Sequence, residues 1–170
     1  MEVEEAKTFE ITRIIENLSS NNLKEAKETI LTRLRVISEE NISKVSEYVV
    51  ASACGSNSKS RLLSELCGCI VEEGKEGKLL KKHLSLHSKK EFDKKTVTVL
   101  SLSQFVSYCF LSGAIPEALV QYILVQQVSI ANPVFQRVKA TIFSSLYSFF
   151  GSQFEGCGTH AHPGRKEAGG

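Results

Sequence analysis

The segment between residues 75 and 95 carries the side chains best suited to binding a charged ligand. It contains eight lysines, two histidines and three acidic residues, whereas the whole chain of 170 residues has a formal net charge of only +2. The lysines are Lys75, Lys78, Lys81, Lys82, Lys89, Lys90, Lys94 and Lys95. Clustered ammonium groups can neutralise phosphates without reading the edges of bases. The segment therefore predicts either contact with an RNA backbone or an ordinary solvated helix face, and both interpretations stay open.

The histidines and cysteines of the chain give weak metal-binding patterns. His83 and His87 are four residues apart, which places them on one helix face with the spacing of zinc ligands. No third ligand is near them, and zinc needs three or four protein ligands. Cys67 and Cys69 lack the two-residue spacer of a redox or zinc motif. We therefore expect no metal and no cofactor.

The sequence also lacks the groups that catalysis needs. A nucleophile requires a base and an orienting group within reach. Two of the four histidines lie in the lysine segment and the other two lie near the carboxyl terminus, at 160 and 162. Only three acidic residues follow residue 95, namely Glu117, Glu155 and Glu167. We therefore expect a protein without enzymatic activity.

Neither end of the chain nor its interior predicts export or membrane insertion. The first residues, MEVEEAK, are acidic and have no apolar core, which is unlike a signal peptide. No apolar run approaches the roughly 18 residues of a membrane span. The five cysteines are odd in number and loosely spaced, as expected for reduced thiols. We expect a monomer without membrane contact, in the cytoplasm or alternatively in the nucleus.

Apolar residues recur every three or four positions almost throughout, which predicts helices. We count eight helical segments that group into four antiparallel pairs, at about 8–37, 42–71, 78–111 and 116–150. Successive antiparallel pairs predict an all-α fold, specifically an α-solenoid of HEAT-like pairs, with an irregular helical bundle as the alternative. The expected domains are a flexible amino terminus at 1–7, the repeat domain at 8–155 and a disordered tail at 156–170.

Several helices are expected to begin at an asparagine. Asn22, with Glu25 three residues later, resembles a capping box at the start of the second helix. Asn41 can cap the third helix. Asn132 followed by Pro133 predicts the start of the eighth helix, since proline fits the first helical position.

Glycine and proline mark other helix ends. Gly74 and Gly77 are expected to end the fourth helix, and Gly113 is expected to end the sixth. Pro116 and Glu117 fit the first turn of the seventh helix, where an acidic side chain also favours the helix dipole.

Five stretches, in this order and at this spacing, resemble the middle domain of eukaryotic translation initiation factor 4G. They are ITRIIENLSSNNLKEA (11–26), ISKVSEYVVASACGSNSKSRLLSELC (42–67), KKEFD (89–93), SQFVSYCFLSGAIPEALVQYILVQQV (103–128) and SSLYSFFGSQFE (144–155). That family is an all-helical stack of HEAT-like pairs. The resemblance therefore implies the same fold as the periodicity.

The chain departs from this family in two places. Lys59 stands near the position where the turn of the second repeat usually has a phenylalanine. The family continues through a fifth repeat with an arginine-rich, aromatic helix, whereas this sequence ends in GCGTHAHPGRKEAGG. We therefore expect a member of this family shortened at its carboxyl terminus, a fragment of one, or a divergent relative.

The resemblance implies a scaffold in mRNA translation initiation. Its expected partners are a DEAD-box RNA helicase of the initiation factor 4A type and RNA bound through its backbone. The residues assigned to the RNA contact are Lys78, Lys81, Lys82, Lys89, Lys90, Lys94 and Lys95. The alternatives are a helical-repeat adaptor in nuclear mRNA processing, decay or export, and a plain protein–protein interaction module.

Overall fold

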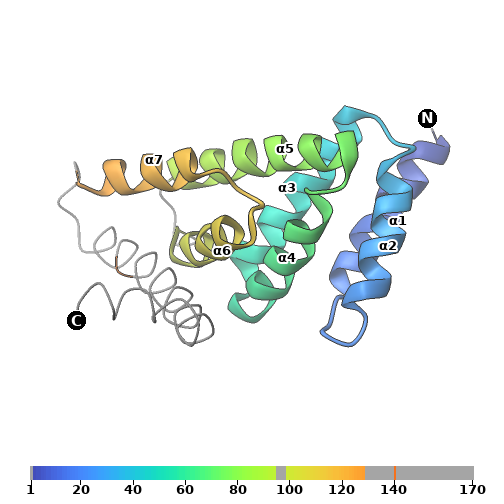
Figure 1. Ribbon diagram of the computed structural model, residues 1–170, viewed down its shortest axis with the longest axis horizontal. Helices are drawn as coiled ribbons and strands as arrows, with labels where there is room; N and C mark the ends of the chain where they lie inside the picture. Colours follow the sequence, from blue (N-terminus) through green and yellow to red (C-terminus); the bar gives the residue numbers. More distant parts are fainter. Residues whose placement is uncertain (1, 95–98, 129–139, 141–170) are drawn as a thin grey trace, which may run out of the picture.

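The computed structural model describes residues 2–94, 99–128 and 140 of the chain. Within these ranges it contains α-helices and no strand, which confirms the prediction of an all-α fold. The helices are α1 (Glu2–Glu16), α2 (Leu23–Leu34), α3 (Glu39–Gly55), α4 (Asn57–Ile70), α5 (Gly74–Asp93), α6 (Val99–Ser112) and α7 (Glu117–Val128). Figure 1 shows α1 and α2 side by side at one end of the molecule and α7 towards the other.

The helices pack in two rows. In one row α1 contacts α3, α3 contacts α5, and α5 contacts α7. In the other row α2 contacts α4 and α4 contacts α6. Helices that follow each other in the chain also touch across the rows, as α1 does with α2, α3 with α4, and α5 with α6. Helices α1 to α5 therefore each bury one side against their neighbours, as the amphipathic periodicity predicts, whereas α6 has no exposed residue from Ser101 to Ser112.

Two glycines let helices approach closely. A Cβ added at Gly68 of α4 would lie 2.7 Å from the Cβ of Ser112 in α6, so only glycine fits this contact. The Ser112 hydroxyl also donates a hydrogen bond of 3.0 Å to the carbonyl of Ser64, which fastens α6 to α4. A Cβ at Gly77 would lie 2.5 Å from the carbonyl oxygen of Ile70. Gly77 is thus a packing residue inside α5, and the prediction that it ends the fourth helix is wrong.

The amino terminus is helical from Glu2, six residues before the predicted start at about Thr8. The side chain of Glu4 explains part of this difference. Its carboxylate accepts hydrogen bonds from the backbone N–H of Ser38, at 2.5 Å, and from the side-chain amide of Asn41, at 2.6 Å. Residues 2–7, expected to be flexible, therefore extend α1 and fasten it to the start of α3.

Two expected helix caps are replaced by other contacts. The Asn22 amide is used within the loop between α1 and α2, since it accepts from the N–H of Ser19 at 2.8 Å and donates to the carbonyl of Asn17 at 2.9 Å. It makes no side-chain cap bond to α2. Helix α3 begins at Glu39 and its cap is Ser38, whose hydroxyl accepts from the N–H of Asn41 at 3.3 Å. Asn41 lies inside the first turn and is not the cap.

The helix ends and starts predicted from glycine and proline agree with the structure only in part. Helix α4 ends at Ile70, and Gly74, with φ of +65°, is the first residue of α5. Gly113, with φ of +86°, directly follows α6 as expected. Pro116 directly precedes α7, which begins at Glu117. The predicted eighth helix, with Asn132 and Pro133, and the predicted tail at 156–170 lie outside the described residues.

Candidate nucleic-acid interface

Helix α5 separates its buried residues from its lysines. Its core positions recur every three or four residues and are Gly77, Leu80, Leu84, Ser88 and Phe92. The lysines at the remaining positions are exposed, and they are Lys75, Lys78, Lys82, Lys89 and Lys90. At about 1.5 Å of rise per residue, Lys75 and Lys89 are roughly 21 Å apart along the helix axis. We call these five lysines the α5 lysine face.

Three of the predicted RNA-contact residues do not belong to this face. Lys81 is half-buried on the flank of α5. Lys94 is exposed but follows the last residue of the helix, where its ammonium contacts Glu91 at 2.7 Å. That carboxylate raises the pKa of Lys94. Lys95 lies outside the described residues. The structure thus brings four of the seven predicted residues, together with Lys75, onto one face.

The start of α3 supplies an acidic partner to the α5 lysine face. The carboxylate of Glu39 lies 2.9 Å from the ammonium of Lys82 and 2.9 Å from Nε2 of His83. The hydrogen bond from Lys82, followed by that from His83, lowers the pKa of Glu39. Lys82 is therefore partly neutralised, and its contact links α5 to α3.

Three lysines of the face have no carboxylate partner in the part of the chain that the structure describes. They are Lys75, Lys78 and Lys90, and all three are exposed. An ammonium group without an ion-pair partner can bind an anion without first breaking an internal contact. These three residues are thus the cations most available to a polyanion.

Helix α7 adds an aromatic residue at the far end of the face. The ammonium of Lys89 lies 4.7 Å from the centroid of the Tyr122 ring, and it also lies 3.6 Å from the carboxylate of Asp93. The Tyr122 hydroxyl donates to the same carboxylate at 2.7 Å, which raises the pKa of Tyr122. Sequence reasoning missed Tyr122 and Glu39 because both come from other helices, and no local spacing indicates which helices pack on α5.

The two histidines of α5 have separate partners. The centroids of the His83 and His87 rings are 6.4 Å apart. Nε2 of His87 lies 3.0 Å from the Ser43 hydroxyl, while His83 contacts Glu39. Burial lowers the pKa of His87. Within the described ranges no three histidine, cysteine, aspartate or glutamate side chains gather closely enough to hold a metal ion.

The cysteines of the described helices differ in exposure. Cys67 and Cys109 are buried, and burial raises the pKa of the Cys67 thiol to about 12. Burial also raises the pKa of Cys109. Cys69 is exposed, although only one residue separates it from Cys67. Thiols buried in this way are poor nucleophiles, since the thiolate is the reactive form.

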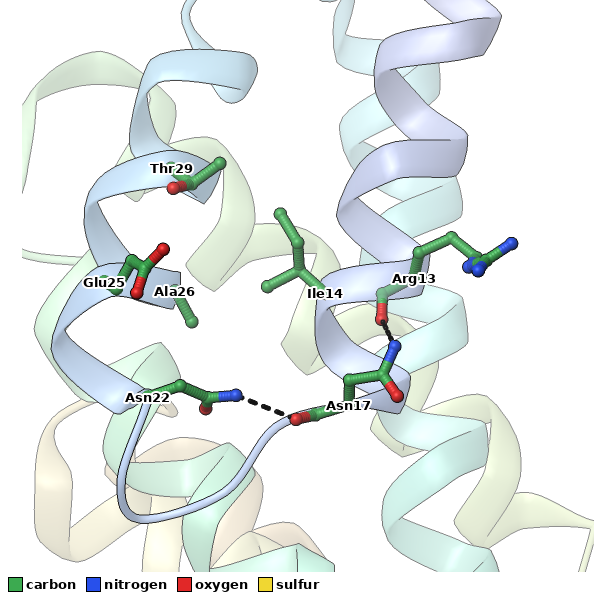
Figure 2. A pocket seen from close by; sticks show the side chains of 7 residues that line it. All are labelled: Arg13, Ile14, Asn17, Asn22, Glu25, Ala26 and Thr29. Atoms are coloured by element: carbon green, nitrogen blue, oxygen red, sulfur yellow. Dashed lines mark hydrogen bonds between the residues drawn. The ribbon is translucent and has the colours of Figure 1, made fainter.

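A groove of about 380 Å³ lies between α1 and α2. Figure 2 shows its lining residues, which are Arg13, Ile14, Asn17, Asn22, Glu25, Ala26 and Thr29. The side-chain amide of Asn17 donates to the carbonyl of Arg13 at 3.0 Å, and the amide of Asn22 donates to the carbonyl of Asn17 at 2.9 Å. These amides stabilise the end of α1 and the following loop.

None of the helices that the structure describes is both long enough and apolar enough to cross a bilayer.

No protein-family model matches the chain. No curated protein matches it. No solved structure matches it either. The functional argument therefore depends on the geometry of the α5 lysine face and on the sequence resemblance.

Proposed function

We propose that this chain is a non-enzymatic scaffold in mRNA translation initiation that binds RNA through the α5 lysine face and holds a DEAD-box RNA helicase of the initiation factor 4A type. The observation that carries the proposal is the set of exposed lysines along one side of α5. Three of them, Lys75, Lys78 and Lys90, have no acidic partner among the described residues.

The packing of the helices supports the HEAT-like part of this proposal. Consecutive helices touch in pairs, and each pair contacts the next through both of its helices, α1 with α3 and α2 with α4, then α3 with α5 and α4 with α6. Such contacts are expected in an α-solenoid, in which each repeat packs only on its neighbours. We therefore interpret the two rows as the two layers of a HEAT-like stack, and the α1–α2 pair as its end.

The RNA part of the proposal rests on charge complementarity. RNA presents a regular line of phosphates, and exposed ammonium groups along a straight helix can neutralise several of them at once. Among the described contacts of the face only Lys82 makes a hydrogen bond, to the carboxylate of Glu39, whereas reading base edges would require several positioned donors. We therefore expect binding that depends strongly on salt and weakly on sequence.

The helicase partner is inferred from the sequence resemblance. Four of the five stretches that carry it cover parts of α1–α5 and the α6–α7 junction (103–128), which are helices of both rows. The fifth stretch, 144–155, lies outside the described residues. A rigid scaffold acts on a two-lobed partner by binding one arrangement of its lobes better than the other. In this role the chain needs no catalytic group of its own.

A plain protein–protein interaction module is the second candidate, and Leu86 favours it. This side chain is 47% exposed on α5, and Lys82, Lys89 and Lys90 lie one helical turn from it. An exposed leucine surrounded by lysines could receive an acidic peptide with an apolar residue.

Two measurements separate these functions. In the first, Lys75, Lys78 and Lys90 are replaced by glutamine, and RNA affinity is measured by fluorescence anisotropy. The control removes three cations outside α5, at Lys24, Arg35 and Lys44. We expect the α5 variant to lose about tenfold in affinity, as for a few phosphate contacts, and the control to stay within about twofold. If both variants lose RNA affinity to the same extent, the assignment of RNA binding to the α5 lysine face is wrong.

The second measurement recovers bound proteins from cell extract with the tagged chain and then tests a purified helicase for ATPase stimulation. We expect a DEAD-box helicase to be recovered and its ATPase to rise. The Leu86→Asn variant is tested in the same extract, and the proteins that it recovers are compared with those recovered by the original chain. If no helicase binds, and if Leu86→Asn abolishes binding of the proteins that are recovered, the plain interaction module is correct and the translation role is wrong.

A further inference from the structure

The junction between α5 and α7 combines cations with an aromatic ring. Lys89 and Lys90 are exposed at the end of the α5 lysine face, and Tyr122 of α7 lies against Lys89. Figure 1 shows α7 beside this end of α5. Proteins that bind single-stranded nucleic acid combine these two components, because lysines neutralise the backbone and aromatic rings stack on bases.

The Tyr122 ring is held in place from two directions. Its hydroxyl donates to Asp93 at 2.7 Å. The ring meets Phe92 in an edge-to-face arrangement, with centroids 6.4 Å apart and an interplanar angle of 74°. Phe92 is fully buried, so it anchors the tyrosine to the core. A ring fixed in this way loses little conformational freedom when it stacks on a ligand.

The cation on the Tyr122 ring is exchangeable. Lys89 pairs with Asp93 at 3.6 Å, and both side chains are roughly half exposed, at 49% and 44%. An exposed ion pair of this kind contributes little stability. A phosphate can therefore replace Asp93 as the partner of Lys89, and the flexible lysine can then leave the ring face free for a base.

We propose that the α5–α7 junction binds single-stranded RNA, with Tyr122 stacking on one base while Lys89 and Lys90 neutralise neighbouring phosphates. This inference rests on the proposed RNA-binding function and specifies its ligand as single-stranded. A base inside a duplex is already stacked on both sides, so its face is closed to Tyr122. A single strand is therefore bound more tightly than a duplex of the same sequence.

The test compares three tyrosine variants of the whole chain. Tyr122→Leu removes the ring, and Tyr122→Phe keeps the ring but loses the hydroxyl. Tyr108→Leu is the matched control, because Tyr108 of α6 also lies under a cation, Arg61, at 5.5 Å from the ring centroid. The probes are a labelled RNA of about 12 nucleotides, within the usual site size for a single strand, the same RNA as a duplex, and inorganic polyphosphate, which has no bases.

We expect Tyr122→Leu to lose about five- to hundredfold in affinity for the single strand, the usual effect of removing one stacking ring. Its affinity for polyphosphate should stay within about twofold of the original protein, as for any change that leaves the phosphate contacts intact. Tyr122→Phe and Tyr108→Leu should retain single-strand binding. An unchanged single-strand affinity in Tyr122→Leu, or an equal loss on polyphosphate, overturns the stacking role.

A spectroscopic readout keeps the test decisive if Tyr122→Leu does not fold. The chain has four tyrosines and no tryptophan, so its intrinsic emission comes from tyrosine. Stacking on a base should quench part of this emission when the single strand binds, and polyphosphate should not. The quenching should be absent in Tyr122→Phe. Equal quenching in Tyr122→Phe and the original protein contradicts the proposal.

Failure of this inference is distinguishable from failure of the proposed function. If the glutamine variant at Lys75, Lys78 and Lys90 loses RNA affinity while Tyr122→Leu does not, the lysine face binds RNA without stacking. If the original protein binds neither RNA nor polyphosphate, both proposals are wrong. If single strand and duplex bind equally and Tyr122→Leu has no effect, only the assignment to single strands is wrong.

Discussion

Lys89 of α5 and Tyr122 of α7 contact each other directly, with the ammonium 4.7 Å from the ring centroid, and Asp93 bonds to both side chains. Asp93 thus holds the two residues that our account assigns to RNA. It also places a negative charge beside the lysines at this end of the α5 lysine face. The balance between these two effects gives the first prediction.

Replacing Asp93 with asparagine should raise RNA affinity about two- to fivefold, the size of one exposed charge contact. The charge that competes with phosphate for Lys89 is removed, while the asparagine oxygen can still accept from the Tyr122 hydroxyl. Fluorescence anisotropy measures the change. Glu65→Gln on α4 is the control, since its carboxylate pairs with Arg61, 3.9 Å away, outside the α5 lysine face. A loss of affinity in Asp93→Asn would contradict the competition argument.

Alanine at Gly68 or Gly77 should destabilise the fold, by about 1–3 kcal/mol or more, because each new methyl group overlaps a neighbouring helix. The effect should be larger at Gly77, where the clash is with the backbone oxygen of Ile70 at 2.5 Å. At Gly68 the nearest atoms are less close, with the Cβ of Ser112 at 2.7 Å and the backbone oxygen of Ser112 at 2.8 Å. Urea unfolding measures both variants.

Gly55→Ala is the control for these substitutions. Gly55 is the last residue of α3, and a Cβ there would meet nothing within 4 Å. Alanine should leave the free energy of unfolding unchanged or raise it by up to about 1 kcal/mol, since alanine is the better helix former. A destabilisation at Gly55 as large as that at Gly77 would show that the packing argument is wrong.

The carboxylate of Glu4 should make stability depend on acid pH. Its hydrogen bonds, chiefly those from Ser38 and then that from Asn41, lower the pKa of Glu4 from 4.5 to about 2. The folded state therefore favours the ionised form, so this stabilisation is complete above about pH 4.5 and is lost as the pH falls towards 2.

Glu4→Gln isolates this contribution. The original protein should be more stable than the variant at pH 7, and the difference in the free energy of unfolding should shrink between pH 4.5 and 2. Urea unfolding at a series of pH values measures it. Glu5→Gln is the control, since Glu5 is exposed. A stability difference for Glu4→Gln that is constant from pH 7 to 2 would refute the assigned role.

The cysteines of α4 and α6 should differ in reactivity. Under native conditions Cys69 should be alkylated by iodoacetamide well before Cys67 and Cys109, whose buried thiols have raised pKa values. Mass spectrometry of the digested protein gives the order of modification. In denaturant all three should react at similar rates. Fast native alkylation of Cys67 would mean that α4 does not bury it.

Much of the helical pattern could be predicted from the sequence, because it depends on local periodicity. The break at Gly113 was placed correctly. The start of the first helix was not, because it depends on a contact between Glu4 and Ser38, which are far apart in the chain. The cap of α3 was also missed, although the bond from the N–H of Asn41 to the Ser38 hydroxyl is local. The role of Gly77 was missed because its neighbour Ile70 belongs to the preceding helix.

The candidate site was predictable to a similar extent. Charge counting located the lysines of α5. It did not reveal that Glu39 neutralises Lys82 or that Tyr122 lies over Lys89. Both contacts depend on which helices pack together. Only the three-dimensional arrangement separates the paired lysines from those available to a ligand.

The salt dependence of RNA affinity tests the central claim most directly. For single strands the logarithm of the binding constant falls with the logarithm of salt concentration, with a slope of about −0.7 for each phosphate neutralised. Glutamine at Lys75, Lys78 and Lys90 should therefore make the slope shallower by about 2. The control at Lys24, Arg35 and Lys44 should keep the original slope. A slope that is the same in the original protein and in the α5 variant would contradict RNA binding by the α5 lysine face.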